Sequence, residues 1–518
     1  MKKLLSVLLV LALAVSFCFA NAASEATSSA PAKTVEYKDT AIIGFQTKTS
    51  SIAPPTQTSV MHRLFFNLTH DTLVDYDEAS ASIKPALATE WKASDDFKVW
   101  TFTLRGDVTF HNGEKFTADD VLFTWEYAKD ASNTNATVKT TYNKIEAIKV
   151  IDDTHVEITL KNGDIDFLYT YANESYSVLN REAVTADAEK GPGIGTGPYK
   201  NVEFVVSDHT TLERYDGYWG EKAPTKTLVF RFISDATTRL AALEAGEIDV
   251  CQGPNNTEHN IIRANDDLVL YVCPGMNLTF LAFNSEVPAL NDPNLRLAIA
   301  YAINNQEIID GAASGVGSVS NGMWGFFTYG YYDDWAGAGL ASFQPQNIEK
   351  AKEYLAKSNY PNGGLKIRMT CNSAWTVGAL QIIQAQLKAL NIDVQVEQLD
   401  SAGFTNMTKA KEHEVVIQSA ALTGAGGDMA KFFTAGNTAN TATYNNEKVS
   451  ELFKLAASEK DEAKRKDYFK QIQVIVHSEA PYIPLYYAGT GVAYSKKVSG
   501  AVWNGSGKFD YSQVKVEK

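Results

Sequence analysis

The chain has 518 residues, of which 47 are Lys or Arg and 61 are Asp or Glu, so its formal net charge is −14. An acidic chain without a run of basic residues is a poor binder of nucleic acid or of an anionic membrane surface. Hydrophobic residues make up 45% and charged residues 21%, which excludes a disordered chain and is typical of folded domains. We expect about three domains at this length.

The first 22 residues have the order of a secretory signal peptide. A basic start at Met1-Lys2-Lys3 precedes the apolar stretch Leu4–Phe19, and Ala20-Asn21-Ala22 has the pattern of a cleavage site. The apolar stretch is shorter than the roughly 20 residues of a transmembrane helix. Lipidation at Cys18 is the less favoured alternative, because a bulky Phe17 stands where lipoprotein signals carry a small side chain. We therefore expect an exported protein.

Three cysteines remain after the signal, and an oxidising compartment permits one disulfide among them. Cys251 and Cys273 each end an apolar run that reads as a strand, so they form the preferred pair; buried free thiols are the alternative. Cys371 is then left over. The absence of a C-x-x-C pair argues against a zinc site and a thioredoxin-like site.

The first 200 residues predict mainly strands separated by turns. Residues 35–46 and 100–104 alternate as strands, and 145–160 reads as two strands around a turn at Asp152-Asp153. Thr117 followed by two Asp residues predicts the start of a helix. The glycine- and proline-rich run 191–198 is a candidate domain boundary.

The rest of the chain alternates strands with helices, which indicates an α/β architecture. The expected strands are 199–206, 228–233, 280–284, 365–369, 393–397 and 414–419. The expected helices are 236–245, 294–303, 348–357, 378–390, 448–457 and 462–477.

Candidate catalytic motifs in the chain do not have the residue spacing that their chemistry requires. The glycine run 191–198 does not fit G-x-G-x-x-G, and Ser506-Gly507-Lys508 lacks the spacing of a phosphate-binding loop. His413-Glu414 begins a zincin-like string, but Ile417 stands where the second His belongs. There is no G-x-S-x-G, and the eight histidines are scattered. We therefore expect no enzyme, no metal site and no cofactor.

Several blocks of sequence recur in an order that is specific to one protein family. They are Leu87-Ala88-Thr89-Glu90-Trp91, Trp100–Arg105, Val108–Glu114, Phe116–Val121, Gly195–Tyr199, Tyr215–Gly220, Ala245–Val250, Phe280–Asn284 and Leu295–Ile303. In these blocks the chain, from about residue 38 to its end, resembles the family-5 extracellular solute-binding proteins. That group contains the oligopeptide, dipeptide and nickel receptors of bacterial ABC importers.

The resemblance implies an α/β fold of the two-lobed periplasmic binding protein type II kind, a clamp with an extra subdomain in the first lobe. Two crossovers near Gly275–Asn277 and Pro484–Tyr487 would form the hinge. The expected division is signal 1–22, flexible leader 23–34, lobe 1 at 35–62, extra subdomain 63–194, lobe 1 at 195–276, lobe 2 at 277–486 and lobe 1 at 487–518.

The resemblance also implies function. A monomeric periplasmic receptor would capture a peptide-like solute between its lobes and deliver it to an ABC permease with a separate ATPase. Burial of the solute between lobes lets a few polar groups decide specificity. The same clamp could instead bind an oligosaccharide, or the fold could serve as an exported chaperone or a sensor that hands its ligand to another receptor.

The chain departs from its peptide-binding relatives in the expected site. Those receptors hold the ligand's α-amino group with an Asp after a strand of lobe 2, and the matching position here is Ala425, three residues before Asp428. The loop around Asn372 also lacks the Arg that clamps a dipeptide's carboxylate. These departures argue against recognition of a short peptide by both charged ends, and the lack of a His/Met cluster argues against a nickel receptor.

Candidate binding residues come from the loops that face the solute in relatives and from two aromatic stretches, 323–335 and 482–487. Trp375 is the strongest of them, because it lies in a strand-to-helix loop. The full set is Trp375, Trp324, Asn372, Thr423, Gly424, Ala425, Asp428 and Tyr486. For Trp324 and the other aromatic residues, packing inside a lobe is the competing interpretation.

Overall fold

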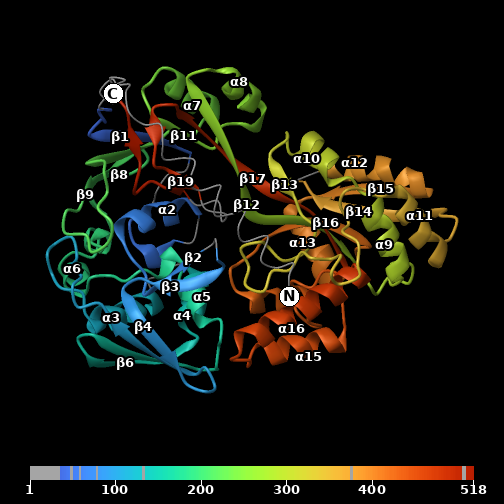
Figure 1. Ribbon diagram of the computed structural model, residues 1–518, viewed down its shortest axis with the longest axis horizontal. Helices are drawn as coiled ribbons and strands as arrows, with labels where there is room; N and C mark the ends of the chain where they lie inside the picture. Colours follow the sequence, from blue (N-terminus) through green and yellow to red (C-terminus); the bar gives the residue numbers. More distant parts are fainter. Residues whose placement is uncertain are drawn as a thin grey trace, which may run out of the picture.

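Two strands that run through the middle of the molecule join its two halves. The computed structural model describes residues 35–46, 51–57, 60–77, 80–130, 135–373, 377–503 and 509–518, and it shows one half on either side of β12 (Leu268–Phe283) and β17 (Tyr482–Ser495) (Figure 1). We call residues 35–276 and 487–518 lobe 1 and residues 277–486 lobe 2. The predicted signal and leader lie outside the described residues.

A mixed sheet of eleven strands extends through both lobes in the order β15-β14-β16-β12-β17-β11-β1-β10-β9-β8, with β13 also paired to β17. Its lobe 1 strands are β1 (Thr40–Phe45), β8 (Tyr199–Val205), β9 (His209–Arg214), β10 (Thr227–Phe232) and β11 (Val250–Gln252). Its lobe 2 strands are β13 (Gly317–Val319), β14 (Leu365–Asn372), β15 (Ile392–Leu399) and β16 (Val415–Ala421). Parallel pairs such as β1 with β10 and β14 with β15 confirm the predicted α/β class.

The extra subdomain of lobe 1 has its own four-stranded sheet, in the order β4-β5-β7-β6, and its own core. The strands of this sheet are β4 (Ala88–Ala93), β5 (Val99–Leu104), β6 (Ile145–Asp152) and β7 (His155–Leu160). A separate pair is formed by β2 (Val74–Asp77) and β3 (Ser82–Pro85). Its helices are α3 (Ala118–Lys129), α4 (Ala136–Tyr142), α5 (Phe167–Tyr171) and α6 (Arg181–Ala186). As the sequence predicted, Thr117 begins α3, where its backbone N–H donates to the Asp120 carboxylate at 2.9 Å.

Helices cover both faces of the lobe 2 part of the sheet, which therefore has two hydrophobic cores. These helices are α9 (Pro293–Ala302), α10 (Asn305–Ala312), α11 (Ile348–Lys357), α12 (Val377–Leu387), α13 (Ser401–Ala410), α14 (Ala430–Phe433), α15 (Glu447–Ala456) and α16 (Glu462–Glu479). The six helices that were expected from the sequence between residues 236 and 477 are all present, with ends shifted by a few residues at most.

The remaining elements of lobe 1 are short. They are α2 (Val60–Thr69), α7 (Ala236–Glu244), α8 (His259–Ala264), β18 (Val498–Ser499), β19 (Val502–Trp503), β20 (Phe509–Asp510) and β21 (Lys515–Val516). Across the described ranges of both lobes, 3₁₀ turns occur at Pro54–Thr56, Glu174–Tyr176, Gly191–Gly193, Asn256–Glu258, Lys388–Leu390 and Gly426–Met429. None of the helices in the described part of the chain is long and apolar enough to cross a membrane.

The disulfide predicted between Cys251 and Cys273 is wrong, because both thiols are buried and free. Neither residue ends a strand as expected: Cys251 is the middle residue of β11, and Cys273 lies inside β12. These two strands lie on opposite sides of β17, where Cys251 is paired with Ala493 and Cys273 with Thr490. Two strand spacings alone amount to roughly 9–10 Å, and the two cysteines are also offset by three residues along β17, so they lie beyond the ~7 Å that a disulfide can bridge. Burial raises the pKa of the Cys251 thiol to about 11.

Candidate functional site

The loop that follows β16 contains four of the predicted binding residues. Inside it, the Thr423 hydroxyl donates to the Asp428 carboxylate at 2.7 Å. The segment around residue 328 is hydrogen-bonded to the loop: the Thr328 hydroxyl donates to the Thr423 carbonyl and the Tyr329 N–H donates to the Gly424 carbonyl, both at 2.8 Å. The structure thus brings Thr423, Gly424 and Asp428 together in one supported loop.

Ala425 lies in the middle of this loop and is 4% exposed. Its methyl group offers no charge, and the nearest acidic residue in the loop, Asp428, already accepts a hydrogen bond from Thr423. The loop therefore presents mainly backbone groups and one carboxylate. Such a surface suits the neutral backbone of a peptide or the hydroxyls of a sugar better than a buried ammonium group.

The extra subdomain touches this loop from the other lobe. The Tyr76 hydroxyl, on β2, donates to the carbonyl of Phe327, and the Gly427 N–H donates to the Asp166 carboxylate at 3.2 Å. The Asp166 carboxylate also accepts from Arg465 of α16 at 2.6 Å. These partners are hundreds of residues apart in the sequence, which offered no signal for them.

The other predicted site residues are distributed differently. Asn372 ends β14 and exchanges hydrogen bonds with the Ser401 hydroxyl across to α13, at 3.1 and 3.2 Å. Trp375, the strongest candidate from the sequence, lies outside the described residues. Trp324 is 1% exposed and stacks on Phe433 with ring centroids 5.4 Å apart, so in this conformation it packs in the core of lobe 2.

Tyr486 is also buried in this conformation, at 4% exposure, and burial raises the pKa of its phenol. It lies on β17, opposite Thr279 of β12, in the two strands that join the lobes. The most exposed aromatic side chains of the 323–335 stretch are instead Phe326 and Tyr331, each 40% exposed.

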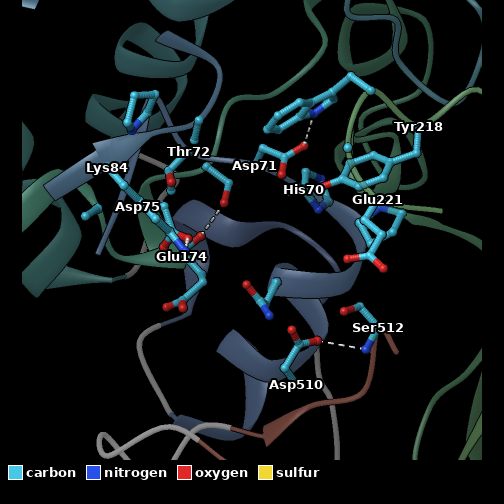
Figure 2. Close-up of a pocket in the computed structure, with 18 of the residues that line it drawn as sticks. His70, Asp71, Thr72, Asp75, Lys84, Glu174, Tyr218, Glu221, Asp510 and Ser512 are labelled. Atoms are coloured by element: carbon cyan, nitrogen blue, oxygen red, sulfur yellow. Dashed lines mark hydrogen bonds and ion pairs between the residues drawn. The ribbon is translucent and has the colours of Figure 1, made fainter. Parts of the chain in front are cut away.

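Lobe 1 contains a cavity of about 430 Å³ between the extra subdomain and the C-terminal segment (Figure 2). Acidic side chains line it: Asp71, Asp75, Glu174, Glu221 and Asp510. One lysine, Lys84, forms an ion pair with Asp75 at 3.0 Å. This lining disfavours an anionic occupant.

The Asp71 carboxyl group in this cavity has a structural function. It accepts hydrogen bonds from the Thr196 hydroxyl at 2.8 Å and from the Trp219 indole at 3.0 Å. Burial raises its pKa, and these hydrogen bonds oppose that change. Asp71 therefore ties the subdomain to the 195–220 segment. Within the described residues, no three His, Cys, Asp or Glu side chains are arranged to hold a metal ion.

Comparison with known proteins agrees with this architecture. Residues 82–475 match the profile of the bacterial extracellular solute-binding proteins, family 5. The chain is 27% identical over 483 residues to heme-binding protein A of Haemophilus influenzae, covering 86% of this chain and 87% of that protein. It is 26% identical over 484 residues to the dipeptide-binding protein of Escherichia coli, covering 86% and 89%.

Solved structures show the same fold. HbpA2 from Haemophilus parasuis superposes with a TM-score of 0.83 at 24% identity, covering 92% of this chain and 100% of that one. DppA from Helicobacter pylori, in complex with the peptide STSA, gives a TM-score of 0.66 at 26% identity over 92% and 98%. The fold defines a two-lobed solute-binding protein. More specifically, the chain belongs to family 5 of the bacterial extracellular solute-binding proteins, as its sequence blocks indicated.

Proposed function

We propose that this protein captures a peptide-like solute between its two lobes in the periplasm and delivers it to an ABC permease driven by a separate ATPase. The observation that carries the proposal is the supported loop 422–428, which contacts the other lobe through the Gly427 N–H and carries one acidic residue, Asp428, bonded to Thr423. The relatives named for dipeptide binding and for a bound peptide support the solute class.

The proposed site consists of Asn372, Trp375 and the loop residues Thr423, Gly424, Ala425 and Asp428. Trp324 and Tyr486 belong to it only if lobe movement exposes them, since both are buried in this conformation. The lobe boundaries at 276/277 and 486/487 are part of the proposal. They place the change of lobe inside β12 and β17, where the register between these strands shifts between Pro274 and Leu278.

Binding can be tested by thermal unfolding of the mature protein with libraries of peptides and of oligosaccharides. A solute at 100 times its Kd adds about 2.7 kcal/mol to the free energy of unfolding. We expect a rise in Tm with peptides, with the solute recovered unaltered by mass spectrometry. A rise with oligosaccharides alone, or a solute recovered cleaved, would contradict the proposal.

A variant then tests the site. Trp375→Ala should weaken peptide binding at least tenfold while leaving the Tm of the solute-free protein unchanged. The matched control is Trp91→Ala, in the extra subdomain, where the indole is half-buried against the subdomain core. That variant should alter stability but not affinity. Equal affinity of Trp375→Ala and the native protein would remove Trp375 from the site.

A further inference from the structure

The two lobes also touch directly through side chains that lie outside the strands joining them. The extra subdomain contributes Asp166, which precedes α5, and Tyr169, which lies within it. Lobe 2 contributes Tyr329 and Arg465, the latter from α16. In Figure 1 the subdomain and the α15–α16 pair lie on the same side of the molecule, below the two joining strands. A change in the angle between the lobes must therefore alter this contact.

An ion pair forms the centre of the contact. Arg465 and Asp166 are 2.6 Å apart, and their side chains are only 6% and 14% exposed. The Arg465 guanidinium is held in place by lobe 2 itself, because it donates to the Ala456 carbonyl at 3.0 Å and lies 4.7 Å from the centre of the Tyr329 ring. A buried charge that is already positioned loses little conformational entropy when its partner arrives.

Asp166 is equally well placed on the other side. It occupies the N-cap position of α5, where an Asp side chain ordinarily accepts a hydrogen bond from its own helix. Asp235 and Asp461 do this for α7 and α16. The Asp166 side chain makes no such bond. Its carboxylate crosses instead to lobe 2, where one oxygen accepts from Arg465 and the other from the Gly427 N–H at 3.2 Å.

Two glycines of the loop make room for the other lobe. A Cβ added to Gly427 would lie 2.3 Å from the Asp166 carboxylate, and one added to Gly424 would lie 2.8 Å from the Tyr76 ring. Neither glycine has a positive φ, and neither Cβ would meet an atom of its own lobe among its nearest contacts. The need for glycine at both positions thus comes from the contact between lobes.

Tyrosine rings fill the rest of the contact. Tyr169 packs edge-to-face on Tyr329 with centroids 5.9 Å apart and on Tyr76 at 5.8 Å. Although Tyr169 belongs to the subdomain, it packs against the hydrophobic core of lobe 2. At the exposed margin, Lys460 pairs with Asp95, which is fully solvent-accessible. That surface pair should contribute little.

We propose that Asp166 and Arg465 are positioning residues that set the relative orientation of the two lobes. They do so by joining the extra subdomain to α16 and to the proposed solute-binding loop. The consequence for solute affinity rests on the proposed function, but the orientation itself does not. The chain's own carboxylate thus makes a contact between lobes that does not depend on a bound solute.

The test measures lobe orientation without any solute. Spin labels on cysteines introduced at the exposed positions Lys149, in the subdomain, and Lys454, in lobe 2, report the distance between lobes by pulsed electron paramagnetic resonance. The native Cys251, Cys273 and Cys371 are buried and should label slowly. In the otherwise native protein we expect one dominant distance.

Asp166→Ala should reduce the population at that distance at least tenfold relative to other distances, because it removes a charge-assisted bond from a buried site. Gly427→Ala should have the same effect by steric conflict, without removing a charge. The matched control is Gly378→Ala, whose Cβ would lie at an ordinary 3.7 Å from its nearest neighbour. It should keep the native distance.

Asp95→Ala, at the exposed margin, should change the distance distribution much less than Asp166→Ala. Circular dichroism melting of each variant shows whether both lobes remain folded. Native distance distributions in both Asp166→Ala and Gly427→Ala would overturn the inference. Because no solute is present, failure to find a peptide ligand leaves this result intact, and a failed orientation experiment leaves peptide binding to be decided by the thermal screen.

Discussion

The loop around Ala425 makes a quantitative prediction about the ligand's amino terminus. A charge-assisted hydrogen bond in a site shielded from water contributes roughly 1.5–3 kcal/mol, which is a factor of ten or more in affinity. At the position where the resemblance places the amine-binding Asp of peptide receptors, this chain has Ala425, which is buried. Asp428 is bonded to Thr423, and Asp166 is bonded to Arg465. We therefore expect N-acetylation of a bound peptide to weaken binding by less than tenfold.

The assay is isothermal titration calorimetry with the best peptide from the thermal screen and its N-acetylated form. In Ala425→Asp, the free peptide should bind at least tenfold more tightly than the acetylated one, because the variant supplies a carboxylate at that position. Asp428→Asn is the control and should change the ratio little. A loss of affinity of tenfold or more on acetylation in the native protein would refute the reasoning. If that loss were then absent in Asp428→Asn, Asp428 would be identified as the amine-binding residue.

Three further predictions concern stability. Arg239→Met should lower the free energy of unfolding by about 3–5 kcal/mol in urea titrations, because the fully buried guanidinium donates to four backbone carbonyls. Arg263→Met, at an exposed position, is the control, and equal urea midpoints for the two variants would contradict the prediction. Burial lowers the pKa of His477 to about 4, below its unfolded value of 6.5, so the free energy of unfolding should fall as the pH drops from 6.5 to 4. The fall should be less steep in His477→Gln, and an equally steep fall in that variant would contradict this role of His477. Finally, Cys251 and Cys273 should react with a thiol reagent only after unfolding, and a reductant should leave the Tm unchanged; a lower Tm would indicate a disulfide.

Local sequence features predicted most of the secondary structure because they depend on near neighbours. The turn at Asp152-Asp153 does separate two strands, β6 and β7, and the Thr117 start of α3 is where the sequence placed it. The predicted strand at 35–46 is shorter, at Thr40–Phe45. Its alternating pattern continues beyond the residues that find a partner strand, and pairing decides where a strand ends.

The sequence alone could not determine the partners of side chains that are distant along the chain. Cys251 and Cys273 do lie in strands, although not at their ends, and β17, which arrives more than 200 residues later, lies between them. Trp324 is the type of residue that often lines a binding site, but Phe433 and Phe453 stack beside it and bury it. In both cases the long-range strand order or packing decides between two locally acceptable outcomes.

The sequence by itself determined the family, the α/β alternation and the acidic character of the chain. Each of these properties depends on the identity of residues and on their spacing over short stretches of sequence. Only the tertiary structure showed that Asp166 reaches Arg465 and Gly427, since 299 and 261 residues separate them. Residues this far apart in the sequence meet only through the tertiary fold, so no pattern of neighbouring residues identifies them as partners.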